Sequence, residues 1–302
     1  MAQWEGKSRG GILGYKIFIW LLRRFGLKAA YILLFFVAFY FIPFAPTATR
    51  SSWFYFRRIH GFSVFKSIYA VYLNYFRFGQ SILDRVALLG GIKTHLTFEF
   101  DGRENLNELV RNQQPALLIS AHIGNWEIAG NLLNHIGGKI NILMFEAEHE
   151  NLKKLLKSVQ KKETKGKYVQ VITLKEDLTH VMELKNVIQQ RELIALHGDR
   201  VPPGSKYFEF DFMGKKAKFP SGPFYLSGKF KIPVCFVFAC REEKGHYHLF
   251  CSKPVYYALS GNGTERENSL KLLIDDYVKA VEEKVKKYPY QWYNFYTFWN
   301  KS

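Results

Sequence analysis

Cysteine is scarce in this 302-residue chain, and acidic residues are nearly missing from its first 80 positions, where Glu5 stands alone. The three cysteines all lie between positions 235 and 251, and an odd number in one stretch excludes a disulfide-stapled scaffold. The sequence also lacks a Walker A loop, a dinucleotide-binding glycine motif, a heptad array and internal repeats. These absences exclude the common nucleotide-binding and repeat architectures.

Positive charge and aromatic side chains, by contrast, are abundant. Lys and Arg number 43 against 26 Asp and Glu, which gives a formal net charge of +17, and aromatic residues make up 17% of the chain. Hydrophobic residues make up 48%, which is too many for a disordered basic tail. A folded, basic and aromatic-rich protein is expected to have an acidic partner, either a nucleic acid or an anionic membrane.

The first 80 residues favour the membrane. They hold eleven basic residues, and positions 29–49 carry no charge at all. A membrane-crossing helix needs about 20 apolar residues, so this stretch suits a helix that crosses the bilayer, enters one leaflet or lies at headgroup depth. Aromatic and basic side chains then interleave from 53 to 78, as expected beside lipid phosphates. We predict a membrane-anchoring, aromatic-rich helical region over residues 1–84 and no nucleic-acid partner. The alternative is an aromatic helix pair buried in a soluble core.

From about residue 85 the signals for strands and helices alternate, which predicts an α/β fold with a mostly parallel, mixed sheet flanked by helices. We assign residues 85–302 to one domain. Strands are predicted at 95–100, 115–120, 139–145, 169–174, 193–196, 232–241 and 246–251. Helices are predicted at 104–111, 126–134, 151–162, 177–190 and 222–230, with a last one from 264 onward.

The segment that follows the second predicted strand carries the most informative pattern. The strand ends at Ser120, His122 follows directly, and Glu127 falls in the first turn of the next predicted helix. Ligands of open α/β sheets bind at the carboxyl ends of strands, where His122 is predicted to lie. A carboxylate on one imidazole nitrogen leaves the other as a general base for a hydroxyl. The alternative is a structural histidine that caps the helix.

A second candidate pair follows the strand predicted at 193–196. Asp199 and Arg200 are expected at the same sheet edge, because the carboxyl ends of parallel strands meet there. Asp199 is suited to orienting a partner, and Arg200 to meeting a phosphate or a developing oxyanion. The alternative is a local ion pair in a turn.

Further basic residues and histidines carry weaker signals. Lys215, Lys216 and Lys218 suit an acidic headgroup or an acidic carrier protein, or else form a solvated basic loop. His246 and His248 share one strand face without a visible third ligand, so no metal site is predicted.

Three blocks, in this order, match a known pattern. HIGNWE (122–127) matches a His-x4-Asp/Glu motif, the stretch 196–239 matches an Asp-containing block with a Phe-x-Gly turn and a Pro-x-Gly-Pro helix start, and 288–299 matches a Pro-x-Gln-Trp ending. Together they resemble the late lipid A acyltransferases, the lauroyl and myristoyl branch of the glycerolipid acyltransferase superfamily. The resemblance covers most of the chain.

The resemblance implies transfer of a fatty acyl group from a thioester to a hydroxyl on an anionic lipid. The donor is then acyl carrier protein or coenzyme A, and no further cofactor is implied. His122 would deprotonate the acceptor hydroxyl while Glu127 steadies the imidazolium. A thioester is already activated, so no Ser or Cys nucleophile is needed, and the cysteines are expected in the core. Oxyanion donors or substrate contacts are expected from Arg200 or from the segment after the histidine, namely Gly124, Asn125 and Trp126.

One departure from the branch leaves the acceptor open. The branch carries arginine after the catalytic helix, whereas this chain has none between Arg111 and Arg191. Lysine neutralises a phosphate but lacks the bidentate fork of arginine. The predicted acceptor is a lipid A precursor. The alternatives are a lysophospholipid, an aminolipid, an aryl-polyene or flexirubin-type lipid and, outside enzymes, a lipid-binding membrane scaffold. Because the carrier-protein donor is cytoplasmic, we expect an interfacial or re-entrant anchor at the cytoplasmic face of a bacterial inner membrane.

Overall fold

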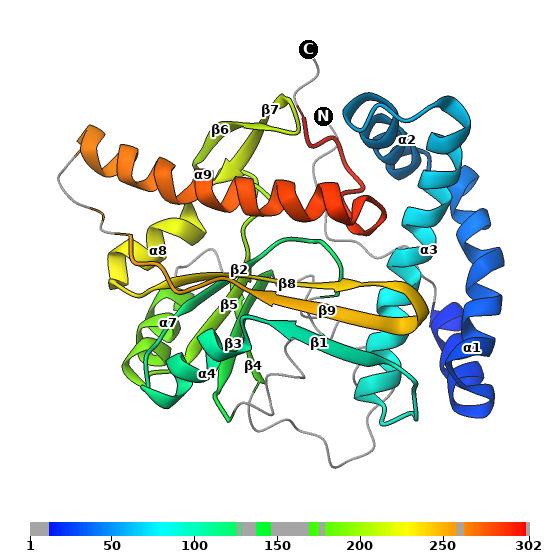
Figure 1. The fold of residues 1–302 in the computed structure, drawn as a ribbon, viewed down its shortest axis with the longest axis horizontal. Coiled ribbons are helices and arrows are strands. Elements are labelled where there is room, and N and C mark those ends of the chain that lie inside the picture. The colour runs from blue at the N-terminus through cyan, green and yellow to red at the C-terminus, as the bar shows by residue number, and fades with distance from the viewer. Residues whose placement is uncertain are drawn as a thin grey trace.

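The computed structural model describes residues 12–125, 128, 137–145, 169–174, 179–257, 259 and 263–299. Within these ranges the chain forms a group of helices followed by an α/β part, and the fold class predicted from the sequence is confirmed. Figure 1 shows helices α1 and α3 standing beside the large sheet, with α9 lying across it.

The two long N-terminal helices, α1 (Ile12–Phe44) and α3 (Val64–Leu89), lie side by side (Figure 1). They approach closely because Gly79 of α3 has no side chain where Leu34 of α1 packs. A Cβ on Gly79 would lie 2.2 Å from a methyl carbon of Leu34. The shorter elements between them are α2 (Pro46–Phe54) and a π-helical turn (Tyr55–Ile59).

Helix α1 is bent and largely exposed. At Gly26 the backbone has a φ of 77°, a left-handed conformation that glycine adopts without strain. Within the described ranges, Gly14–Phe44 is one helix long and apolar enough to cross a membrane, and only 17% of its apolar window is buried. Its exposed large side chains include Trp20, Phe25, Ile32, Phe36, Tyr40 and Phe44.

Seven strands form the large sheet in the order β1-β9-β8-β2-β5-β3-β4. The strands are β1 (Thr97–Asp101), β2 (Leu117–Ser120), β3 (Ile140–Phe145), β4 (Val169–Leu174), β5 (Leu193–His197), β8 (Val234–Arg241) and β9 (His246–Cys251). All neighbours are parallel except β8 and β9. Strand β2 lies in the centre between β5 and β8, so its carboxyl end opens onto the middle of the sheet edge.

The side chains of β2 alternate between two buried layers. Leu117 and Ile119 belong to a large cluster that includes residues of α9 (Gly263–Lys287), whereas Leu118 packs in a second cluster with α4 (Arg103–Arg111). This is why β2 reads as a continuous apolar run in the sequence. The remaining described helices of the α/β part are α7 (Thr179–Gln189), α8 (Gly222–Phe230) and two 3-10 turns, at Glu243–Gly245 and Pro289–Gln291.

A small antiparallel hairpin was not predicted from the sequence. It consists of β6 (Tyr207–Phe212) and β7 (Lys215–Pro220). Both turn residues, Met213 and Gly214, have positive φ, at 55° and 78°, as two-residue type I′ hairpin turns require. In the view of Figure 1 the hairpin and the large sheet lie on opposite sides of α9.

The other predicted elements agree closely with the structure. The strands at 169–174 and 246–251 and the helix at 222–230 coincide with β4, β9 and α8, and the remaining described elements differ by a few residues at their ends. The helices predicted at 126–134 and 151–162 fall outside the described residues, apart from Ile128. The division into residues 1–84 and 85–302 stays a prediction, and one buried cluster contains residues from both sides of it.

Candidate active site

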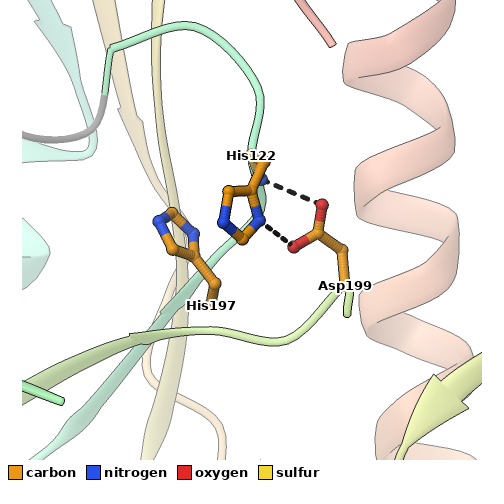
Figure 2. A group of neighbouring side chains, drawn as sticks. All are labelled: His122, His197 and Asp199. Carbon is orange, nitrogen blue, oxygen red and sulfur yellow. Dashed lines mark hydrogen bonds and ion pairs between the residues drawn. The ribbon is translucent and has the colours of Figure 1, made fainter. Parts of the chain in front are cut away.

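A histidine and an aspartate meet at the carboxyl edge of the large sheet. His122 lies two residues beyond the end of β2, and Asp199 lies two residues beyond the end of the parallel neighbour β5. The backbone N–H of His122 donates to Oδ2 of Asp199 at 2.9 Å, and Nδ1 of the ring lies 2.7 Å from Oδ1. As Figure 2 shows, one carboxylate therefore holds both the backbone and the ring of His122.

Asp199 is buried but surrounded by groups that favour its ionised form. Burial alone raises the pKa of a carboxyl, but His122, His197 and Arg200 lower the pKa of Asp199 below its usual range. The indole N–H of Trp292 also donates to Oδ2, at 3.4 Å. An ionised Asp199 accepts a hydrogen bond from Nδ1–H of His122, which fixes the tautomer that has its lone pair on Nε2.

His197, the last residue of β5, was not among the predicted site residues. Its ring centroid lies 4.1 Å from that of His122, and Figure 2 shows the ring of His122 between His197 and Asp199. Burial lowers the pKa of His197 well below its ordinary value of 6.5, and the nearby His122 acts in the same direction. A neutral His197 therefore packs against His122 without adding a competing charge. Its place at a strand end, two residues before Asp199, was the available sequence signal.

These three side chains offer ligand atoms within 4.8 Å of one another. Both oxygens of Asp199 already accept hydrogen bonds from His122, which favours an imidazole–carboxylate pair over a metal centre. Elsewhere, His248 of β9 has a ring nitrogen within 4.8 Å of carboxylate oxygens of Glu99 and Asp101 of β1, because β1 pairs in parallel with β9. The absence of a metal site stays a prediction.

The loop after His122 is held by backbone hydrogen bonds. The N–H of Gly124 donates to the carbonyl of Gln291 at 2.8 Å, and the N–H of Asn125 donates to the carbonyl of Ala239 at 2.7 Å. Gly124 has a φ of 68°, and a Cβ there would lie 2.0 Å from the carbonyl oxygen of Ala239, so only glycine fits. Because both amide hydrogens are used, the predicted role of these two N–H groups as oxyanion donors does not fit this structure.

The side chain of Asn125 faces the protein interior. Its amide donates to the carbonyl of Ser81 in α3 at 2.7 Å and lies 3.4 Å from the hydroxyl of Tyr247. Asn125 therefore fixes the loop to α3 instead of facing substrate, contrary to its predicted role. Trp126 and Glu127 lie outside the described residues, so their predicted roles stay predictions.

The segment 288–299, which we call the C-terminal strap, crosses the same edge of the sheet. The N–H of Tyr293 donates to the carbonyl of His122 at 2.9 Å, and the strap also supplies the contacts of Gln291 and Trp292 described above. Sequence reasoning treated this segment only as a matching ending. Its dense aromatic content was the signal that it is buried.

Comparison with known proteins places this chain in a family. The sequence profile of the bacterial lipid A biosynthesis acyltransferases matches residues 76–301. The chain belongs to this family. It is therefore an acyltransferase, as predicted, and family membership together with the exposed apolar surface of α1 indicates association with a membrane. The assignment to the lauroyl or myristoyl branch stays a prediction.

No curated protein matches the chain significantly. Among solved structures, the chain is similar to the 1-acyl-sn-glycerophosphate (LPA) acyltransferase PlsC from Thermotoga maritima. The similarity covers 86% of this chain and 97% of that chain, at 14% sequence identity and a TM-score of 0.39.

Arg200 of this acyltransferase lies at the same sheet edge as His122. Its Nη2 donates to the carbonyl of Tyr293 at 3.2 Å, and its guanidinium carbon lies 5.9 Å from the ring centroid of Tyr296. The structure therefore brings Arg200 to the site, as the sequence predicts.

The two lysines predicted to contact substrate lie on the hairpin strand β7. The ammonium of Lys215 is 5.5 Å from the ring centroid of Phe54, and that of Lys218 is 4.4 Å from the ring centroid of Tyr207. These contacts place both lysines beside aromatic rings of other elements. Their predicted role toward a headgroup or a carrier protein stays a prediction.

Proposed function

We propose that this acyltransferase moves a fatty acyl group from acyl carrier protein to a hydroxyl of a lipid A precursor, with His122 as the general base. The observation that carries the proposal is the contact between Nδ1 of His122 and Oδ1 of the buried Asp199. The family match supports lipid A chemistry as the reaction class.

The arrangement of His122 suits proton removal from an alcohol. Asp199 accepts the Nδ1–H hydrogen bond, so Nε2 is the nitrogen with a lone pair to take the hydroxyl proton. The positive charge that forms on the ring is then stabilised by the carboxylate 2.7 Å away. In this proposal Asp199 performs the orienting role that the sequence assigned to Glu127.

The helical packing favours docking on one leaflet over a full membrane crossing. Helix α1 contacts α3 along much of its length, from Leu22 to Leu34 and beyond. Helix α3 is in turn tied to the sheet, because Asp84 of α3 forms an ion pair with Arg241 of β8 at 3.0 Å. A crossing α1 would have to release α3 or draw sheet-bound charges into the bilayer, where charges are costly. We therefore propose that the exposed face of α1 inserts into the cytoplasmic leaflet of the inner membrane.

Mass spectrometry of total lipids and lipid A tests the reaction and the acceptor together. The samples are a deletion strain and the same strain complemented with wild type or with His122→Ala. We expect lipid A lighter by one acyl chain in the deletion strain, restored by wild type alone. Loss of an acyl chain from another lipid class would move the acceptor to one of the alternatives, and full rescue by His122→Ala would remove the catalytic proposal.

Protease digestion tests the membrane placement. Spheroplasts expose the outer face of the inner membrane, so a domain docked on the cytoplasmic face is expected to stay intact until the membrane is opened. Digestion in intact spheroplasts would contradict the one-leaflet arrangement.

A further inference from the structure

The first half of helix α1 carries a hollow lined by cationic side chains. The hollow has a volume of about 490 Å³, and its described lining residues are Lys16, Ile19, Trp20, Arg23 and Arg24. Residues at these spacings share one face of a helix, because each turn takes about 3.6 residues. Ligand sites have volumes of about 300–1,000 Å³. The hollow is therefore large enough to hold a lipid headgroup.

Packing holds the walls of this hollow in place. Ile19 packs against the buried cluster that joins α1 to α3. The ring of Trp20 meets that of Phe25 edge-on, with the centroids 5.6 Å apart. The guanidinium carbon of Arg24 lies 5.4 Å from the centroid of the same Phe25 ring. Phe25 therefore orders one aromatic and one cationic wall before a ligand arrives, which lowers the entropy cost of binding.

The charge of the hollow favours an anion. The sequence has no acidic residue between Glu5 and Asp84, and Asp84 is buried and paired with Arg241. In the described part of the chain, neither Lys16 nor Arg24 forms an ion pair with a carboxylate. Like charges that are held on one helix face repel each other. An anion bound between the cations of the hollow offsets this repulsion.

The two halves of α1 together match an anion that carries acyl chains. All the charged side chains of the helix lie at or before Lys28, and the backbone bends between the two halves at Gly26. Beyond the bend the exposed side chains are apolar, Ile32 and Phe36 among them, at 66% and 64% exposure. Cations next to exposed apolar side chains are typical of a helix that lies on an anionic membrane.

Helix α3 separates this hollow from the catalytic edge. Figure 1 shows α3 between α1 and the large sheet. Leu22 turns the buried face of α1 toward α3, whereas Lys16, Trp20 and Arg24 are exposed. The loop that follows His122 is held on α3 through Asn125. A phosphate in the hollow therefore belongs to a lipid other than the one placed at His122.

We propose that this hollow binds the phosphate headgroup of an anionic phospholipid of the membrane, a lipid that the enzyme does not acylate. Lys16, Arg23 and Arg24 bind the phosphate by charge-assisted hydrogen bonds, and Trp20 lies beside the glycerol and the first part of the acyl chains. The inference rests on the proposed docking of α1 on one leaflet. It adds that this docking requires anionic lipid.

Co-sedimentation of the purified full-length protein with vesicles tests the proposal. The vesicles contain phosphatidylcholine alone or phosphatidylcholine mixed with phosphatidylglycerol. The test variant combines Lys16→Gln, Arg23→Gln and Arg24→Gln. We expect it to bind the mixed vesicles about 100-fold more weakly than wild type, because each cation near an anionic surface contributes about 5-fold. Binding to phosphatidylcholine alone should not change. Gln is a good helix former, so the Tm of the variant should equal that of wild type.

A matched control removes the same number of charges elsewhere. Arg103→Gln, Arg111→Gln and Lys229→Gln lie at exposed positions on α4 and α8. We expect this combined variant to bind the mixed vesicles within about 3-fold of wild type, because salt screens charges that lie far from the surface. Equal losses from the two triple variants would mean that binding follows net charge, and they would overturn the proposal.

Native mass spectrometry in detergent identifies the occupant. Wild type is expected to retain one phosphatidylglycerol in preference to phosphatidylcholine, and the variant at positions 16, 23 and 24 is expected to lose it. Retention of a lipid A precursor through the same three cations would assign the hollow to the acceptor and overturn the proposal. Displacement of phosphatidylglycerol by an equal concentration of inorganic phosphate would overturn it too, because the site would then bind free anions.

Failure of this inference can be distinguished from failure of the proposed function. Equal binding of wild type to both kinds of vesicle removes the inference and leaves the docking of α1 intact. Binding to neither kind removes the docking as well. Lipid binding is measured without turnover, so the activity of His122→Ala bears on the proposed acyl transfer alone.

Discussion

The helical group and the α/β part use the same aromatic-rich composition in opposite ways. Of the 21 large hydrophobic side chains that are exposed, 15 lie at or before Phe78 and six lie in the rest of the described chain. In the α/β part, the rings of Phe212, Trp292 and Trp299 are buried against one another instead. Aromatic abundance alone therefore does not mark a membrane surface. What marks it is the concentration of exposed rings on one group of helices.

The largest effect is expected inside the α/β part, at Asp199. Asp199→Asn keeps the size of the side chain but loses the negative charge and can stabilise the wrong tautomer of His122. We expect kcat to fall by about 10³- to 10⁴-fold, equally in detergent and on vesicles. Equal loss in both settings would show that the interior chemistry does not depend on the membrane surface. A loss seen only on vesicles would contradict the role given to Asp199.

The next largest effect is expected on the free energy of unfolding, from a substitution where the helical group and the α/β part join. Asp84 of α3 is fully buried and pairs with Arg241 of β8, and it also accepts hydrogen bonds from Tyr31 of α1 and Tyr247 of β9. Asp84→Ala leaves the Arg241 charge without its partner, and we expect a loss of about 3–5 kcal/mol in the free energy of unfolding.

Urea unfolding in detergent measures the effect of Asp84→Ala, with Tyr31→Phe as the control that removes one hydroxyl. The control is expected to cost about 1.5–3 kcal/mol, because the hydroxyl of Tyr31 donates to a charged carboxylate. Equal losses from the two variants would mean that the buried ion pair does not join the regions.

A moderate effect is expected on binding to vesicles, from substitutions on the exposed face of α1. Phe36 and Phe44 are each 64% exposed, and replacing both with Ser removes apolar surface that is available to lipid. Burying a Phe side chain contributes about 1.5–3 kcal/mol, so vesicle partitioning should fall by at least about 10-fold. Activity in detergent should stay unchanged. Leu272→Ser, an equally exposed position on α9, is the control and should leave partitioning unchanged.

The smallest expected effect is a loss of thermal stability at low pH, and it arises from His60 at the turn before α3. Burial lowers the pKa of His60 from 6.5 to about 4, and Lys66 and Lys286 act in the same direction. The unfolded chain therefore binds a proton at a higher pH than the folded chain, so stability is lost as pH falls from about 6.5 to about 4. We expect the Tm of wild type to fall by roughly 2–4 °C more than that of His60→Phe over this range. Parallel curves for the two proteins would contradict the assignment to His60.

Local sequence pattern predicts the elements of this fold well and the contacts between them poorly. Alternation and apolar runs locate β4 and α8 at their observed bounds, because those signals arise within a few residues. The hairpin β6–β7 was missed although its strands alternate, because its Met-Gly turn is not one of the strong hairpin dipeptides.

The same limit explains what was missed in the site. Sequence placed both His122 and Asp199 at the carboxyl edge, but it paired His122 with Glu127, the nearer carboxylate along the chain. The observed partner lies 77 positions away, and the Asp84–Arg241 pair spans 157 positions. No local periodicity marks such pairs, because strand order brings them together. The strap residues Gln291 and Trp292 were overlooked for the same reason.

The C-terminal strap has a consequence for the order in which the protein matures during synthesis. Gln291, Trp292 and Tyr293 hold the loops that carry His122 and Asp199, and the ribosome makes them after every other part of the site. The apolar surface of α1 leaves the ribosome more than 200 residues earlier. The nascent chain can therefore meet the membrane long before the loops that carry His122 and Asp199 are held in place.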